Sequence, residues 1–501
     1  MPTQITTRAQ VNGHRFLLRR LQHALVRGDS RMIHDPMRGQ MRSLMVGVVI
    51  AVLIAGSAGV LAFFKPAPNF GRSAIMLSKT DGALYVRLGE TLHPALNLAS
   101  ARLIVGKNDP PDEVDNKFLN TVARGPMVGI VGAPNGIHGG DDLGMSSWSV
   151  CDAAARPAAG NTAAFPGIET TVLANDPVLT DSVRSSTAEE AVLTRADDTT
   201  YLIYDGVRAA VDPDDPVVSA ALGLADGKVR EMSRGLLNAF PLVEPIEPTP
   251  VENLGTATSY LPAEYPVGSL LRTVDSQGEQ LWVVLAEGVQ PVSAAAADVI
   301  RYSNPRSPAS EPVSVSPAIM SDISVVDQLP VEHLPTSRPR LVDADPNRVL
   351  CLSWQRAGTD AEPTTRLLVG DRLPLEEGTR PVRLATADGS GPGLDSVYLE
   401  PGTGEYVQAT GVDGAGQQAG RLFYVNDLGL RFHLSDSPTA EALGVVGVGG
   451  PEGAENAAQP APWPVLSLLP PGPELSQQAA LLVHDGMAGD PDSAIVTAPS
   501  G

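Results

Sequence analysis

The run Ser43–Phe64, SLMVGVVIAVLIAGSAGVLAFF, contains 22 residues and no charged side chain. As an α-helix rising about 1.5 Å per residue it is roughly 33 Å long, enough to cross a hydrocarbon core of about 30 Å. A helix in the core of a soluble protein is the alternative, but such helices are rarely this long without a polar interruption. The run therefore predicts a transmembrane helix over residues 43–64.

The charges on the two sides of this run have opposite sign. Residues 1–42 carry eight Arg and two Asp, a net charge of +6, whereas residues 65–501 carry 28 Lys and Arg against 55 Asp and Glu, a net charge of −27. Basic flanks stay in the cytoplasm, so we expect a cytoplasmic N-terminus and about 435 residues outside. A cleaved signal peptide is disfavoured because both the 42 preceding residues and the apolar run are too long. The outer charge argues against nucleic-acid binding.

The N-terminal segment 6–28, TTRAQVNGHRFLLRRLQHALVRG, predicts a basic amphipathic helix. Thr6 or Thr7 can cap its start and Gly28 can end it. Its candidate partner-docking residues are Phe16, Leu17, Leu18, Arg19, Arg20, Leu21 and Leu25. Such a helix can lie on the anionic inner leaflet or pack on a cytoplasmic partner, and the sequence leaves both open.

Two cysteines, Cys151 and Cys351, lie in the segment expected outside the cytoplasm, where disulfides persist. Each is three residues from a tryptophan, Trp148 or Trp354, in what reads as a short buried strand. The even count and the oxidising compartment favour a bridge over two unrelated buried thiols. Closing a loop of about 200 residues would contribute at most roughly 5 kcal/mol. The chain has no C-x-x-C motif that would indicate redox catalysis.

A weak internal repeat runs through the outer segment. Four glycines, Gly89, Gly206, Gly288 and Gly429, each follow an aromatic or β-branched strand pattern and precede a short apolar strand and a helical patch. Each suits a bend that needs a positive φ or a close backbone approach. The spacings are irregular, so the repeats do not form a simple solenoid. We expect four scattered strand-turn-strand-helix pseudo-repeats around a central β core made by the two cysteine segments.

The fold class predicted is thus a single N-terminal transmembrane helix followed by a large mixed α/β, β-rich extracytoplasmic domain. After the cytoplasmic helix and connector (1–42) and the span (43–64), the predicted segments are repeat one (74–106), the Cys151 core segment (120–155), repeat two (190–240), repeat three (267–303), a Pro-rich connector (304–340), the Cys351 core segment (341–375), repeat four (395–445) and a Pro/Gly-rich tail (446–501). Residues 241–267 are expected to form a second Pro-rich connector, and both connectors are expected to lie on the surface. The last fifteen residues look disordered.

Catalytic signatures are missing from the sequence. Gly223–Val229 approaches a P-loop but has three residues between its glycines, and Val229 replaces the Ser or Thr that would bind magnesium. We interpret it as the end of a helix in repeat two. Neither G-x-S-x-G nor H-E-x-x-H occurs. The sequence therefore predicts no catalytic, cofactor-binding or metal-binding residue.

Long strings, in order along nearly the whole chain, resemble the EccB family, the single-span membrane component of the mycobacterial type VII (ESX) secretion system. The strings are GHRFLLRRLQHALVR at 13–27, GALYVRLGETLHPALNLASARLIVG at 82–106, RGPMVGIVGAP at 124–134, SSWSVCD at 146–152, MSRGLLNAFP at 232–241, EGVQPVS at 287–293 and LLPPGPELSQQAALLVHD at 468–485. The segment VLCLSW departs somewhat from the tryptophan-rich form of the family.

This resemblance implies a core subunit of a hexameric bacterial inner-membrane complex, with EccC, EccD and EccE as partners and the mycosin protease on the periplasmic side. It also implies a periplasmic part with four repeats around a disulfide-bonded β domain, which dimerises. The leading hypothesis is a non-catalytic structural subunit that supports protein export without a cofactor. The alternatives are an ATPase or hydrolase, with ATP as its cofactor, and a cell-wall-binding module. The family is sometimes labelled ATPase, but EccC is the expected motor.

Overall fold

The computed structural model describes residues 7–31, 36–64, 73–137, 145–154, 167–276, 278–305, 311–357, 360, 362–389, 393–414, 420–445 and 458–486. The chain divides into an N-terminal part, Met1–Arg72, and a C-terminal body, Ser73–Gly501. The prediction of disorder for the last fifteen residues lies outside the described residues.

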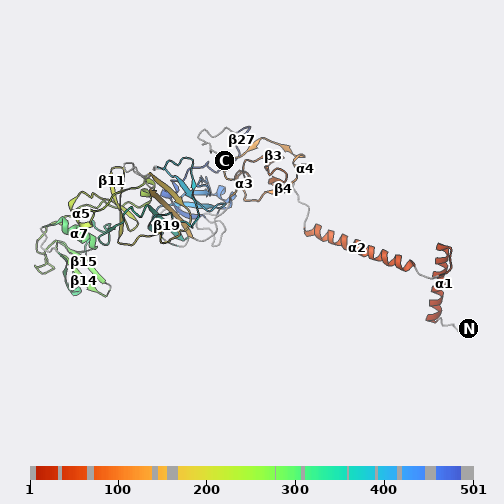
Figure 1. Cartoon of the computed structure of the whole chain (residues 1–501), viewed down its shortest axis with the longest axis horizontal. Helices are drawn as coiled ribbons and strands as arrows, with labels where there is room; N and C mark the ends of the chain where they lie inside the picture. Colours follow the sequence, from red (N-terminus) through yellow and green to blue (C-terminus); the bar gives the residue numbers. More distant parts are fainter. Residues whose placement is uncertain are drawn as a thin grey trace. The chain divides into compact units, whose positions relative to one another are not determined.

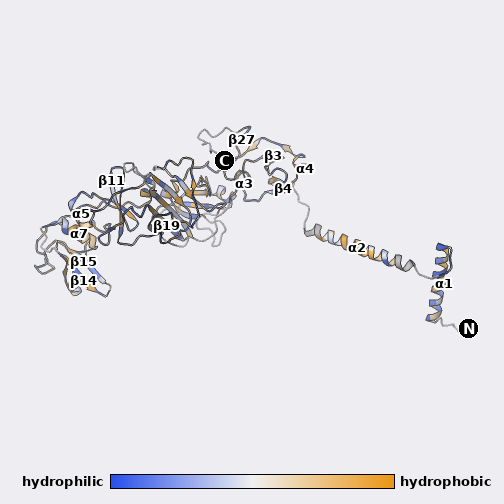
Figure 2. Ribbon diagram, viewed as in Figure 1, coloured by the Kyte–Doolittle hydropathy of each residue, from blue (hydrophilic) through white to orange (hydrophobic). Residues whose placement is uncertain are grey.

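The N-terminal part contains the two predicted helices (Figure 1). Helix α1 (Arg8–Arg27) begins after Thr7 and ends at Gly28, whose φ of 66° is left-handed. Helix α2 (Pro36–Phe64) begins before the apolar run and contains one candidate membrane span, Met41–Val60, with a mean hydropathy of 2.3. Hydrophobic residues predominate along α2, whereas α1 carries both hydrophobic and hydrophilic residues (Figure 2). The part of α2 that precedes the apolar run includes Arg38 and Arg42, so the basic flank of the span is helical.

A seven-stranded sheet forms the centre of the C-terminal body. Its strands, in spatial order, are β21 (Val382–Arg383), β22 (Ser396–Tyr398), β8 (Ile168–Leu173), β7 (Met145–Ala154), β19 (Val349–Ala357), β20 (Thr364–Gly370) and β9 (Val183–Ser185). The long strands β7 and β19 pair antiparallel and place Trp148 opposite Trp354 and Cys151 opposite Cys351. The cysteines form the predicted disulfide. Because side chains alternate across a strand, the tryptophans and the disulfide lie on opposite faces of the sheet.

Four repeats share one topology: a three-stranded antiparallel meander, a helix, and a return strand that pairs parallel with the first strand. Repeat one comprises β1 (Ile75–Ser78), β2 (Leu84–Leu88), β3 (Thr91–Pro94), α3 (Leu98–Val105) and β4 (Asp112–Val114). Repeat two comprises β10 (Glu190–Ala196), β11 (Thr199–Tyr204), β12 (Val207–Ala210), α5 (Pro216–Leu222) and β13 (Arg230–Glu231). Repeat three comprises β14 (Leu270–Asp275), β15 (Gly278–Val284), β16 (Val289–Val292), α7 (Ala294–Ser303) and β17 (Val313–Ser314). Repeat four comprises β23 (Gly404–Thr410), β24 (Leu422–Asn426), β25 (Arg431–His433), α9 (Ser437–Ala442) and β26 (Gln459–Pro462). The predicted fold class is confirmed, and the return strand is a feature that the sequence pattern does not predict.

The segments that follow the repeats cover their free sheet edges. The third strand of each repeat receives a parallel extended segment at its open side, through the bridges Ala95–Val128, Arg208–Leu242, Val289–Val325 and Arg431–Pro471. In repeats two to four this segment is Pro-rich, and an edge strand tolerates proline because its outer N–H groups have no partner. Ile246, Val331 and Leu475 in these segments are buried. The Pro-rich stretches are therefore structural parts of the repeats, beyond the surface connectors expected from sequence.

The remaining elements are short. They are α4 (Asn116–Leu119), β5 (Ala123–Arg124), β6 (Met127–Val128), α6 (Arg234–Ala239), α8 (Pro317–Met320), β18 (Arg340–Leu341), α10 (Trp463–Leu466), α11 (Gln477–Ala480) and β27 (Val483–His484). The C-terminal elements return to repeat one, where β27 pairs with β6. The Nε2 of His484 lies 2.8 Å from the carbonyl oxygen of Gly129.

The hydrophobic cores divide the repeats into an inner pair, repeats two and four, which pack on the central sheet, and an outer pair, repeats one and three, which do not. One core joins the tryptophan face of the central sheet to repeats two and four. A second core is shared by repeats two and three, and a third by repeats one and four. Repeats one and three accordingly lie at opposite ends of the C-terminal body, with β19 between them (Figure 1). Every repeat thus depends, directly or through its neighbour, on the central sheet.

We predict that Cys151→Ser/Cys351→Ser lowers the free energy of unfolding of the C-terminal body by about 3–5 kcal/mol, because the bridge closes a separation of 200 residues. Urea unfolding of the full-length protein in mild detergent, followed by tryptophan fluorescence, measures the loss. Wild type treated with reductant is the matched control, and its free energy of unfolding should fall by a similar amount. An unchanged urea midpoint in both samples would show that the bridge contributes nothing to stability.

Candidate functional site

The P-loop-like segment has the wrong geometry for phosphate binding. Gly223 ends α5 in a left-handed conformation, with its N–H bonded to the carbonyl of Ser219, as expected from the sequence. A P-loop leads into the N-terminus of a helix, where free N–H groups and the positive end of the helix dipole bind phosphate. The loop here leaves a C-terminus, whose carbonyl oxygens repel anions. Among the described residues there is also no group of three or more His, Cys, Asp or Glu that could hold a metal ion.

Helix α1 exposes every candidate docking residue. None of its residues is buried, and Leu17, Leu21 and Leu25 are 60, 59 and 78% exposed. At about 100° per residue these three leucines lie on one face with Leu18, whereas Phe16 points roughly 100° away from Leu17. Arg19 and Arg20 are also exposed, and the Nε of Arg20 donates to the carbonyl of Ser30 in the connector. The structure thus brings the leucines together as one open apolar face, which we call the leucine face.

The four repeat glycines occupy the predicted hairpins, but their surroundings differ. A Cβ on Gly206, which has a φ of 77°, would lie 2.8 Å from the Oγ1 of Thr365 on β20. A Cβ on Gly429 would lie 2.6 Å from a methyl carbon of Val397 on β22. Gly89 meets nothing within 4 Å, and a Cβ on Gly288 would lie 2.2 Å from the carbonyl oxygen of Ser324. The glycines of the inner repeats thus allow close contact with the central sheet.

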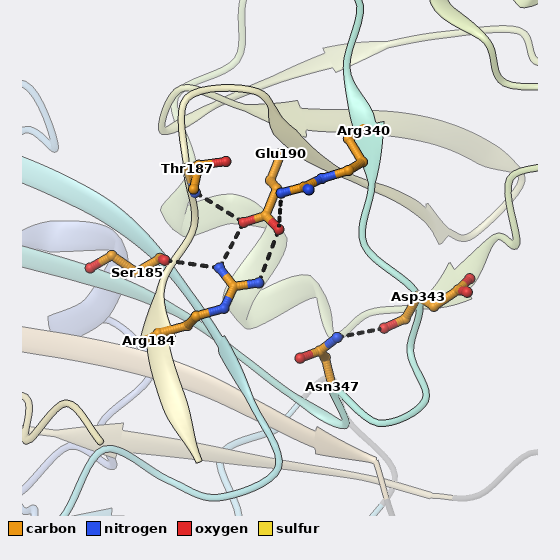
Figure 3. Close-up of polar contacts among 7 residues, drawn as sticks. All are labelled: Arg184, Ser185, Thr187, Glu190, Arg340, Asp343 and Asn347. Atoms are coloured by element: carbon orange, nitrogen blue, oxygen red, sulfur yellow. Dashed lines mark hydrogen bonds and ion pairs between the residues drawn. The ribbon is translucent and has the colours of Figure 1, made fainter. Parts of the chain in front are cut away.

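A buried carboxylate that the sequence did not single out joins the central sheet to repeat two (Figure 3). The side chain of Glu190, at the start of β10, is 5% exposed. Arg184 on β9 donates to both of its oxygens, at 2.7 and 2.9 Å, and Arg340 on β18 donates at 2.9 Å. The backbone N–H of Thr187 donates a fourth hydrogen bond at 3.0 Å. The contact of Glu190 with Arg340 spans 150 residues, so no local pattern reveals this junction.

Electrostatics at this junction favour the ionised carboxylate. The hydrogen bonds from Arg184 lower the pKa of Glu190 from 4.5 to about 2, and the N–H of Thr187 and the charge of Arg340 act in the same direction. Burial opposes the shift but does not cancel it. Since Arg184 and Arg340 are 48 and 67% exposed, solvent screens part of the attraction.

A second buried carboxylate, Asp152, follows the disulfide on β7. It accepts hydrogen bonds from the N–H and Oγ of Ser233, at 2.6 and 2.7 Å, and from the Oγ1 of Thr170. Burial raises the pKa of this carboxyl group. Burial also lowers the pKa of the nearby Arg230 to about 10, and the charge of Asp152 opposes this shift. The guanidinium of Arg230 donates to the carbonyls of Asn347 and Arg348. Ser233 caps α6, so Asp152 fixes the start of α6 on the central sheet.

We predict that Glu190→Gln lowers the free energy of unfolding by about 2 kcal/mol at pH 7, discounted for the exposed arginines. The pKa is depressed in the folded protein, so the ionic contribution is complete above pH 4.5 and is lost as pH falls toward 2. The difference between variant and wild type should therefore narrow below pH 4.5.

Urea midpoints of the full-length protein between about pH 3 and pH 8 measure this dependence. Glu189→Gln, at the exposed neighbouring position, is the matched control and should leave the midpoint unchanged. A constant difference between Glu190→Gln and wild type over the whole pH range would contradict the ionic role of Glu190.

Comparisons with known proteins agree with this architecture. Residues 3–489 match the family model described as "Type VII secretion system ESX-1, transport TM domain B". The chain is 33% identical to "ESX-1 secretion system ATPase EccB1" of Mycolicibacterium smegmatis, covering 99% of both chains. It is also 33% identical to "ESX-5 secretion system ATPase EccB5" of Mycobacterium tuberculosis, covering 99% of this chain and 97% of that one.

Two solved structures extend the likeness to three dimensions. A chain of the intact ESX-5 inner membrane complex matches with a TM-score of 0.70 at 31% identity, covering 99% of both chains. The EccB3 dimer from the ESX-3 core complex matches with a TM-score of 0.65 at 31% identity, covering 82% of this chain and 100% of that one. The family match and these relatives, each aligned over most of the chain, show that it belongs to the EccB family of type VII secretion membrane proteins.

Proposed function

We propose that this protein is a non-catalytic core subunit of a type VII secretion inner-membrane complex, and that it supports protein export by anchoring and assembling that complex. The observation that carries the proposal is the leucine face of α1, which is open along its length and precedes a membrane-spanning helix. An apolar helix face is stabilised only when it is covered, so it favours a protein that works by docking on others.

The charge distribution supports an orientation with the N-terminus in the cytoplasm. The basic residues lie before the span, and the disulfide belongs to the C-terminal body, which fits an oxidising periplasm. In this arrangement segment 1–42 docks, segment 43–64 anchors, and the four repeats form the periplasmic assembly. The solved ESX-5 and ESX-3 structures, an inner membrane complex and an EccB3 dimer, support membership of a larger assembly and self-association.

The partners in this proposal are EccC, EccD and EccE, which would share a hexameric complex, with the mycosin protease on the periplasmic side. The leucine face would contact the cytoplasmic parts of these subunits, with Arg20 beside it and Arg19 on the opposite side of α1. A basic helix with one apolar face can pair with an acidic, apolar groove on a partner through both charge and packing.

We predict that Leu17→Glu/Leu21→Glu abolishes recovery of the large complex, because two charges would be buried at the docked face. Native mass and composition of the tagged full-length protein, purified in mild detergent, measure recovery. Asn12→Glu is the matched control, since it adds a charge on the opposite side of α1 and should leave the complex intact.

A non-reducing gel separates loss of docking from loss of folding, because a folded C-terminal body contains the Cys151–Cys351 bridge. An intact complex in the double variant would contradict the docking role of the leucine face. Equal loss in Asn12→Glu would contradict its specificity, whereas a wild type that purifies alone would overturn the proposed function.

The relatives' name, ATPase, supports a competing proposal in which the C-terminal body hydrolyses ATP. The loop that comes nearest to a P-loop follows a helix C-terminus, and a periplasmic body would lie in a compartment that generally lacks ATP. We therefore expect a fluorescent ATP analogue to show no saturable binding to the purified protein with Mg²⁺ present. Saturable binding that unlabelled ATP displaces would contradict the non-catalytic proposal.

A further inference from the structure

A groove of about 680 Å³ lies in the C-terminal body where the Pro-rich segments that follow repeats two and three meet. Residues 244–253 form one wall and residues 328–334 the other, and the turn 285–287 between β15 and β16 closes the end. The groove belongs to neither the junction at Glu190 nor the leucine face.

The floor of the groove is apolar and its rim is acidic. Leu285 and Leu334 are buried at 3 and 6% exposure, and Leu329 is half-buried. Four exposed glutamates stand among the lining residues, namely Glu244, Glu247, Glu252 and Glu287. No lysine or arginine is among the described residues that line the groove, so their negative charge is not neutralised by a strong base within it.

The walls offer hydrogen-bond acceptors, and two of their side-chain donors are already used: the hydroxyl of Thr249 donates to the carbonyl of Glu247, and the amide of Gln328 donates to a carboxylate oxygen of Glu287. Pro245, Pro248, Pro250 and Pro330 line the groove and have carbonyl oxygens but no backbone N–H. The imidazole of His333 is already engaged, since its Nε2 lies 3.2 Å from the carbonyl oxygen of Pro245 and its Nδ1 lies 3.8 Å from a carboxylate oxygen of Glu244. A ligand that supplies donors therefore suits these carbonyl oxygens.

Two buried amide side chains hold the walls in place. The Oε1 of Gln290, which is 2% exposed, accepts from the backbone N–H groups of Gln328 and Leu329 at 2.9 and 2.8 Å. Asn304, 6% exposed, accepts from the N–H of Val251 at 3.0 Å and donates to the carbonyl of Thr249 at 3.1 Å. Because the walls are fixed in advance, binding does not have to order them.

We propose that this groove docks an extended basic segment of a partner protein. Arginine and lysine combine an apolar stem with a head group that only donates hydrogen bonds. The stems, and any aliphatic side chains beside them, would pack on the leucine floor while the head groups meet the glutamates and the proline carbonyls. This inference goes beyond the scaffold function and stands without it, because it concerns a surface of the C-terminal body that the leucine face does not include.

The test uses a fluorescein-labelled peptide, (Arg-Pro-Leu)₃, and its acidic analogue, (Glu-Pro-Leu)₃, in fluorescence anisotropy with the full-length protein in mild detergent. The buffer contains about 0.15 M salt, at which exposed charges more than about 8 Å apart are largely screened from one another. The basic peptide should bind saturably and the acidic one should not. Glu247→Gln/Glu252→Gln/Glu287→Gln should weaken binding of the basic peptide about tenfold, since three charge pairs at the rim of the groove are lost together.

The control for the overall negative charge of the protein is the triple variant Glu113→Gln/Glu376→Gln/Glu377→Gln. It removes three exposed glutamates that do not line the groove. This variant should bind the basic peptide within about twofold of wild type. Equal weakening in both triple variants would overturn the proposal, because attraction would then come from the whole acidic body. Absence of saturable binding to wild type would overturn it as well.

Discussion

The antiparallel pairing of β7 with β19 is the constraint on which the C-terminal body depends. It joins segments 200 residues apart, fixes Trp148 opposite Trp354, and allows the disulfide between Cys151 and Cys351. The tryptophan face forms one core with repeats two and four, and those repeats share the other cores with repeats three and one. Asp152 and Glu190 then add two buried polar junctions beside this pairing, one to α6 and one to repeat two.

The topology of the repeats explains why the body is rich in proline. Each meander would leave an open edge, which is prone to pair with other chains. Here the chain covers that edge with its own extended segment after every repeat, and proline-rich sequence fits because one side of such a segment needs no donors. The segments that follow repeats two and three also form the walls of the groove. The same residues therefore cover a sheet edge and provide the proposed docking surface.

The sequence predicted the elements with strong local signals and not the long-range ones. A 22-residue uncharged run and a leucine pattern ended by Gly28 each encode a helix locally, and both helices appear where expected. The four repeat glycines lie between the second and third strands of their meanders. The return strands are two to four residues long, too short to carry a periodic pattern. Glu190 and Arg340 meet across 150 residues, and the edge-covering segments look like linkers because proline masks their strand pattern. The leucine face could be predicted from local spacing, whereas the partner that we propose for it could not.

A central sheet cross-linked by a disulfide thus supports all four repeats as one rigid scaffold. Native-state hydrogen exchange of the oxidised full-length protein tests this dependence of the repeats on the sheet most directly. We expect the amides of β7 and β19 to exchange slowest and only through global unfolding, the inner repeats to exchange next, and repeats one and three to open first. Slower exchange in repeat one or three than in β7 and β19 would show that the repeats are stable without the central sheet, and would contradict the scaffold.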